Sequence, residues 1–140
     1  MIRKYRPEDL PPVLNIWLKS NQDSHSFIAE TYWESHLEYM KQVLPQAEVY
    51  VYEIQNQVVA FVGIENNYIA GIFVREINRS QGIGKQLLNH LKKTHSTLSL
   101  RVYEKNRKAM KFYAREGFQI IKEEIDTENN EKEWSMHWKK

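Results

Sequence analysis

The 140-residue sequence contains no cysteine. This absence excludes disulfide bonds, zinc sites built on thiolates and a cysteine nucleophile. No stretch approaches the roughly 20 apolar residues that a membrane-spanning helix needs, and the charged segment Met1–Pro7 is not followed by the apolar run of a signal peptide. We therefore expect a soluble, cytoplasmic protein with no membrane partner.

A large excess of charge of one sign is also missing. The chain carries 20 Lys and Arg against 18 Asp and Glu, a formal net charge of +2. Such a balance does not hold nucleic acid non-specifically, so no nucleic-acid partner is expected. Of the five histidines only His90 and His95 lie close together, and the cysteines of a zinc finger are absent. We expect no metal site.

Hydrophobic residues make up 41% of the chain, which is typical of a globular protein. The length suits one ordinary domain, so residues 1–140 are predicted to form a single domain. Leu10, Val13, Leu14 and Trp17 recur at helical spacing. A polar connection over 21–26 and a helix over 29–42 are expected next. Strands are predicted at 2–5, 49–52, 58–64 and 68–74, and the last three form an antiparallel meander.

The pattern changes after Gly82. A helix is expected to residue 93, a buried strand over 98–102, a helix from Asn106 to near Gly117, and strands over 118–125 and 132–138. The strand–helix–strand order of residues 68–103 predicts a parallel pair with a right-handed crossover. The predicted fold class is therefore α/β, a mixed sheet with helices packed on it.

A glycine turn, Arg79-x-x-Gly82-x-Gly84, lies between a predicted strand and a predicted helix. The first N–H groups of a helix have no internal partner and the helix dipole is positive there, so this position favours an anion. Glycine also lets the backbone approach a phosphate closely. We predict a pyrophosphate site whose candidate residues are Arg79, Gln81, Gly82, Ile83, Gly84 and Lys85.

Taken alone, the glycine turn is equally consistent with an ordinary tight turn. It is too short for a P-loop, and it comes too late in the chain for a dinucleotide-binding fold. A second motif follows it. Asn106 is a good helix N-cap, and Gly117 suits the left-handed position that ends a helix. Tyr113 lies between them, on the same helical face as Ala109 and Phe112. The apolar members of this motif are interpreted as core: Ala109, Phe112 and Phe118.

The two motifs, in this order after Ile72-Phe73-Val74, resemble the GNAT superfamily of N-acetyltransferases, and within it the small bacterial YiaC/YjaB type. The resemblance extends over nearly the whole chain. It implies the GNAT fold, a mixed, mostly antiparallel sheet of about six or seven strands with flanking helices and a parallel pair at the cofactor cleft. It also implies acetyl-CoA as cosubstrate and no metal.

The resemblance assigns roles to the motifs. Ile72, Phe73 and Val74 correspond to the strand that pairs with the pantetheine arm, and 81–85 to the pyrophosphate loop. Asn106 corresponds to the asparagine that contacts the cofactor arm. One departure concerns the loop: many members have a proline where this chain has Glu76.

Tyr113 corresponds to the tyrosine near the cofactor sulfur, and we expect it to be the general acid. Tyr68, at the start of the cofactor strand, is the leading candidate for the base, and Glu65 and Glu104 are weaker candidates. His25 is interpreted as an incidental loop histidine. The basic residues around the last helix are interpreted mainly as a solvated face: Lys105, Arg107, Lys108, Lys111 and Arg115.

The expected function is acetyl-CoA-dependent N-acetylation of a primary amine by direct attack in a ternary complex. The acceptor is a protein lysine, a protein N-terminus or a small amine, and the protein a monomer or homodimer. The alternative is a non-catalytic acyl-CoA-binding sensor or interaction module on the same fold. Tyr113 favours the enzyme, because a binding module needs no proton donor there.

Overall fold

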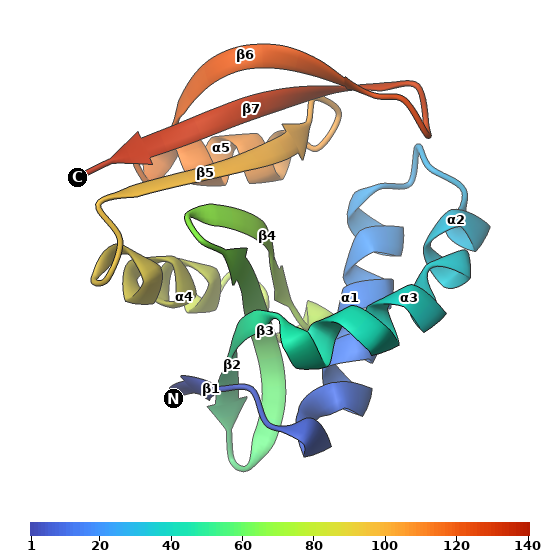
Figure 1. The fold of residues 1–140 in the computed structure, drawn as a ribbon, viewed down its shortest axis with the longest axis vertical. Coiled ribbons are helices and arrows are strands. Elements are labelled where there is room, and N and C mark those ends of the chain that lie inside the picture. Colours follow the sequence, from blue (N-terminus) through green and yellow to red (C-terminus); the bar gives the residue numbers. More distant parts are fainter.

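The computed structural model describes residues 1–140, which form one seven-stranded sheet flanked by five α-helices (Figure 1). The sheet order is β1-β2-β3-β4-β5-β7-β6, and only β4 and β5 are parallel. The predicted fold class is confirmed. The strands are β1 (Ile2–Lys4), β2 (Glu48–Ile54), β3 (Gln57–Glu65), β4 (Tyr68–Val74), β5 (Thr97–Tyr103), β6 (Gln119–Asp126) and β7 (Glu131–Lys139).

The helices cover both faces of the sheet. They are α1 (Leu10–Ser24), α2 (Glu30–Ser35), α3 (Leu37–Val43), α4 (Ile83–Lys92) and α5 (Arg107–Arg115). The first three pack against one face of β2 and β3, while α4 and α5 cover the opposite face. β3 is consequently buried on both sides, which explains its nearly continuous apolar sequence. Three short 3₁₀ segments complete the chain: 7–9, 44–46 and 76–78.

The parallel pair of β4 and β5 is brief. Tyr68 lies opposite Ser99, whose N–H donates to the carbonyl of Asn67 at 2.9 Å, and no further residues of the two strands pair. The strands then diverge, so most of β4 has a neighbour on the β3 side alone (Figure 1). Backbone groups on its other edge are left free for a ligand.

The end of α1 differs from the prediction. The helix continues to Ser24 through residues that were expected to form a polar connection. Asn21, one of these residues, is buried, as is the preceding Ser20, and the Asn21 amide donates to the Trp17 carbonyl at 2.9 Å. The polar composition therefore reflects a helix end that faces a polar cleft.

The predicted helix over 29–42 is two helices, α2 and α3, separated at His36. The reason is competition for the carbonyl of Tyr32. Ser35 Oγ donates to this oxygen at 2.6 Å and His36 Nδ1 lies 2.7 Å from it. These side chains occupy the acceptor that the next helical N–H would use, so the helix ends there.

Candidate active site

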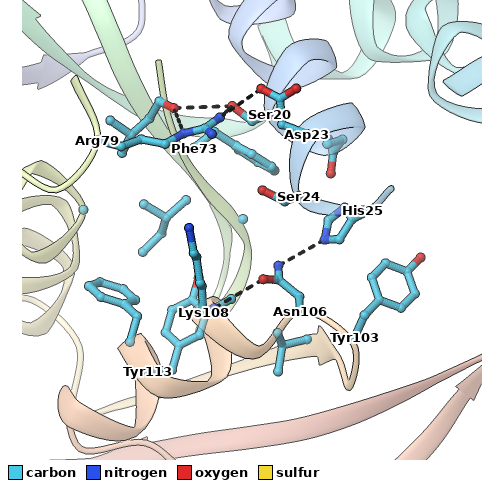
Figure 2. Close-up of a pocket in the computed structure, with 18 of the residues that line it drawn as sticks. Ser20, Asp23, Ser24, His25, Phe73, Arg79, Tyr103, Asn106, Lys108 and Tyr113 are labelled. Atoms are coloured by element: carbon cyan, nitrogen blue, oxygen red, sulfur yellow. Dashed lines mark hydrogen bonds and ion pairs between the residues drawn. The ribbon is translucent and has the colours of Figure 1, made fainter. Parts of the chain in front are cut away.

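A cleft of about 1220 Å³ opens between the diverging strands β4 and β5 (Figure 2). Its walls come from the end of α1, the start of α4 and the start of α5. Every residue predicted for the site lines this cleft except Gln81, whose side chain turns back to the Ile77 carbonyl at 3.5 Å. The lining residues from the prediction are Tyr68, Ile72, Phe73, Val74, Arg79, Gly82, Ile83, Gly84, Lys85, Asn106 and Tyr113.

The glycine turn forms a set of free backbone donors. Gly82 has φ of +82° and is the N-cap of α4. The first N–H that bonds within the helix is that of Gln86, which donates to Gly82 O at 3.1 Å. The N–H groups from Gln81 to Lys85 donate to nothing in the protein. This arrangement, at the positive end of a helix, suits a phosphate.

Arg79 connects the glycine turn to its surroundings. Its Nε donates to the carbonyl of Val74 at 3.0 Å, and its Nη2 donates to Ser20 Oγ at 3.4 Å and lies 3.7 Å from Asp23 (Figure 2). The guanidinium therefore holds the turn against the end of β4 and against α1. This structural role was not evident from the sequence.

The free edge of β4 faces the same cleft. Arg75 N donates to Val59 O of β3 at 2.8 Å. Because successive residues of a strand point their N–H groups to opposite sides, the N–H groups of Val74 and Ile72 point away from β3, toward the cleft. The edge can accept an extended amide-bearing chain as an additional strand.

Asn106 begins α5 and contacts the far wall of the cleft. Its Oδ1 accepts from Ala109 N at 3.3 Å, and its Nδ2 lies 3.2 Å from His25 Nε2 (Figure 2). The His25 ring packs edge-on against Tyr103 and tilted against Trp33. Burial lowers the pKa of His25 to about 4. His25 is therefore a neutral part of the cleft wall, which corrects its interpretation as an incidental residue.

Tyr113 lies at the floor of the cleft on α5. Its side chain is 8% exposed and packs edge-on against Phe118. No protein group hydrogen bonds its hydroxyl. Burial, and then the nearby Tyr68, raise the pKa of Tyr113 well above its usual range. The phenol is protonated at neutral pH and is free to donate to a ligand atom.

The acetyltransferase (GNAT) domain family matches residues 45–120, from just before β2 to the start of β6. The chain belongs to this family. It is 34% identical over 140 residues to the peptidyl-lysine N-acetyltransferase YiaC of Escherichia coli (strain K12), covering 99% of this chain and 96% of YiaC. It is 30% identical to the peptidyl-lysine N-acetyltransferase YjaB of Salmonella typhimurium, covering 89% and 88%.

Solved structures agree with the fold of this GNAT acetyltransferase. The solution structure of apo YjaB from Escherichia coli superposes with a TM-score of 0.87 at 23% identity, covering 99% of this chain and 96% of YjaB. The PaiA N-acetyltransferase of Thermoplasma acidophilum, solved in complex with coenzyme A, gives 0.80 at 20% identity, covering 100% and 98%. The enzyme class expected from the sequence is confirmed.

The cleft lining carries more basic than acidic residues. Seven basic and three acidic residues line it, and Lys108 extends into it from α5 (Figure 2). Of the five basic residues around α5 that were interpreted as a solvated face, only Lys111 lies outside the lining. Helical spacing alone does not show which exposed side chains around α5 face the cleft. Four of the basic ones line it: Lys105, Arg107, Lys108 and Arg115.

The weaker candidates for the base lie outside the cleft lining. Glu65 ends β3, and Glu104 contacts Lys132 at 3.6 Å. An acidic residue that the sequence did not single out, Glu133 of β7, does line the cleft. No helix of this GNAT acetyltransferase is long and apolar enough to cross a membrane. No group of three or more metal-ligating side chains is present.

Proposed function

We propose that this enzyme transfers the acetyl group of acetyl-CoA to the side-chain amine of a protein lysine. One observation carries the proposal: a single cleft holds the free N–H groups of the glycine turn, the free edge of β4 and the unpaired phenol of Tyr113. The lysine acceptor is supported by the relatives YiaC and YjaB, which are peptidyl-lysine N-acetyltransferases.

The glycine turn would bind the pyrophosphate of the cosubstrate. The N–H groups of Gly82 to Lys85 offer several donors to one anion, and the basic lining lowers the energy of an anion throughout the cleft. The pantetheine arm would then lie along β4, with its amides paired to Ile72 and Val74. Asn106 would contact this arm from α5, on the opposite side of the cleft.

The acetyl carbonyl would lie beyond the pantetheine amides, toward the Tyr68 end of the free edge of β4. Attack by an amine places negative charge on the carbonyl oxygen, and a backbone N–H of this edge is suited to stabilise it. The amine must be neutral when it attacks, whereas a lysine amine has an ordinary pKa of about 10.4. Tyr68, 37% exposed at this end of β4, would contact the acceptor.

Tyr113 would protonate the departing sulfur. An ordinary phenol has a pKa of about 10 and a thiol one of about 8.5, so complete transfer costs roughly 2 kcal/mol. Burial raises the pKa of Tyr113 further, which makes transfer before C–S cleavage more costly. We infer that the phenol donates a hydrogen bond as charge develops on sulfur, and that the proton moves as the bond breaks.

A peptide assay tests the proposal. The protein is incubated with acetyl-CoA and a lysine peptide whose N-terminus is blocked, and thiol release and peptide mass are followed together. We expect thiol release matched by one added acetyl group per peptide. The control peptide carries arginine in place of lysine and is expected to remain unmodified. Binding of coenzyme A without thiol release on lysine peptides contradicts the proposal.

A further inference from the structure

Three carboxylates line the cleft: Asp23, Glu116 and Glu133. Asp23 lies 3.7 Å from the Arg79 guanidinium. Glu116 is at the far end of α5, where its carbonyl accepts from Lys92. Glu133 lies instead on β7, on the side of the cleft away from the glycine turn. We call this part of the cleft the acceptor half, and it is bounded by Tyr68, Arg101, Tyr103 and Glu133.

The sheet register directs the Glu133 side chain toward the cleft. Glu133 lies opposite Tyr103 of β5 and Glu124 of β6, and directly opposed residues share one face of a sheet. The alternate residues of β7, Trp134 and Met136, pack on the other face into the core that α4 and α5 cover. Glu133 therefore faces the open side of the sheet.

Glu133 differs from its acidic neighbours in having no basic partner. Glu124 lies 2.6 Å from Arg101 Nε, and Glu131 lies 3.1 Å from Lys105 Nζ. Glu133 forms no ion pair and no side-chain hydrogen bond, although it is half-buried. A carboxylate withdrawn from water without a partner is unfavourable, and a cationic ligand would relieve this cost.

The surroundings increase the affinity of Glu133 for a proton. Burial, and then the charges of Asp126 and Glu124, raise its pKa, while Arg101 opposes them. The phenols of Tyr68 and Tyr103 complete the set of titratable groups that face it, and burial raises the pKa of both. Tyr68 is therefore a neutral phenol at physiological pH and is better suited to hydrogen bonding than to removing a proton.

His25 is not suited to remove a proton either. Its Nε2 lone pair faces the amide of Asn106, and its Nδ1 is buried without a partner. No other uncommitted basic atom lines the acceptor half.

We propose that Glu133 binds the ammonium group of the acceptor lysine and removes the proton that the amine must lose before attack. The inference rests on the proposed function. An N–H bond of the ammonium breaks and its proton passes to a Glu133 oxygen. The nitrogen lone pair then forms the C–N bond, the C–S bond breaks, and the sulfur receives the phenol proton of Tyr113. A second proton then leaves the nitrogen and passes to the Tyr113 phenolate, which restores the phenol. Glu133 releases its proton to water.

The test compares Glu133→Gln with Glu123→Gln, using the lysine peptide. Glu123 is an exposed residue of β6 that does not line the cleft. In Glu123→Gln, its ion-pair partner Lys132 still has a second partner, Glu104. At pH 7 we expect Glu133→Gln to lower kcat/KM by about 100-fold or more, the usual contribution of a general base. Coenzyme A affinity is expected to be unchanged in both variants, and Glu123→Gln to keep wild-type activity.

The pH profile separates proton removal from a structural role. Without Glu133 the rate depends on the small fraction of lysine that is already neutral, so kcat/KM of Glu133→Gln should rise about tenfold per pH unit from about pH 7 to 9. The wild type should be nearly flat over this interval. Glu133→Asp, which keeps a carboxylate, should retain the flat profile at reduced rate. The Glu133→Gln variant should melt at the same temperature as the wild type or higher, because an unpaired carboxylate is removed.

Two results would overturn the inference: wild-type kcat/KM in Glu133→Gln, or a loss of activity whose size does not change with pH. A lowered melting temperature with weakened coenzyme A binding would assign Glu133 a structural role and overturn it as well. These results require an active wild-type enzyme. If the wild type itself releases no thiol with lysine peptides, it is the proposed function that fails.

Discussion

The Nδ2 amide of Asn106 lies 3.2 Å from Nε2 of His25 and joins the start of α5 to the end of α1 across the cleft. The other end of this amide accepts from Ala109 N, so the group cannot rotate without loss of the helix cap. The network thus assigns a lone pair to His25 Nε2 and its proton to Nδ1. A second proton on the ring would face the amide donors of Asn106.

The first prediction concerns the stability of the protein between pH 6.5 and 4. The pKa of His25 is lowered from 6.5 to about 4 in the folded state, so the unfolded chain binds the proton first. The free energy of unfolding should decrease as pH falls through this window, by at most about 3 kcal/mol from this residue. Urea unfolding at several pH values measures it. His25→Gln should show a correspondingly weaker pH dependence, and an unchanged slope would contradict the assignment.

A second prediction uses the two glycines at the start of α4. Gly82 has φ of +82° with no atom within 4 Å of an added Cβ, whereas a Cβ on Gly84 would meet Phe112 at 3.6 Å, an ordinary contact. Gly82→Ala should therefore lower the free energy of unfolding by about 1–2 kcal/mol through backbone strain alone. Gly84→Ala, the matched control, should be nearly neutral. Equal stabilities by urea unfolding would show that the turn does not require the left-handed conformation.

A third prediction concerns the anion site of the glycine turn. Coenzyme A should bind at least about 100-fold more tightly than pantetheine, because two hydrogen bonds to a charged group contribute about 3 kcal/mol or more. Added salt should weaken coenzyme A binding and leave pantetheine binding nearly unchanged. Calorimetry with each ligand at two ionic strengths measures the ratio of the two affinities and the salt dependence of each. Similar affinities for the two ligands would contradict a pyrophosphate site at the turn.

A fourth prediction addresses a buried ion pair far from the cleft. Asp9 is 3% exposed and accepts from Arg3 Nη1 and Nη2 at 2.8 and 2.9 Å and from Arg6 N at 2.7 Å. In Asp9→Ala, Glu53 is the remaining ion-pair partner of Arg3. The substitution should lower the free energy of unfolding by about 3–5 kcal/mol. Glu38→Gln, which removes an exposed ion pair with Lys41, should change stability by less than about 1 kcal/mol.

The Arg3–Asp9 pair also predicts a pH dependence at the acid end. The Arg3 hydrogen bonds lower the pKa of Asp9 below its ordinary 3.8. Its contribution to stability is therefore complete above about pH 4 and is lost as pH falls through the lower, folded-state pKa. Asp9→Asn should not show this loss of stability at acid pH, because it has no carboxylate to protonate. If the variant loses stability with acid as the wild type does, the Arg3–Asp9 pair is not its source.

The sequence predicted the order of strands and helices well, because alternation and helical spacing are local signals. It also identified the two motifs that line the cleft, since Gly82 and Asn106 have requirements set by their own neighbours. Features that depend on distant contacts were not predictable. The partnership of His25 with Asn106 and the unpaired state of Glu133 arise from where the sheet brings remote segments together. The division between α2 and α3 is local, but it depends on side-chain contacts with the Tyr32 carbonyl that helical spacing does not reveal.

The most direct measurement is thiol release from acetyl-CoA, with a lysine peptide as acceptor, by the wild type and by Tyr113→Phe. The Tyr113 hydroxyl makes no hydrogen bond within the protein, so the variant should keep its melting temperature and its affinity for coenzyme A. The wild type is expected to release thiol only with the peptide, and Tyr113→Phe to lower kcat by about 10²–10⁴-fold. Full turnover by a folded Tyr113→Phe would contradict the account.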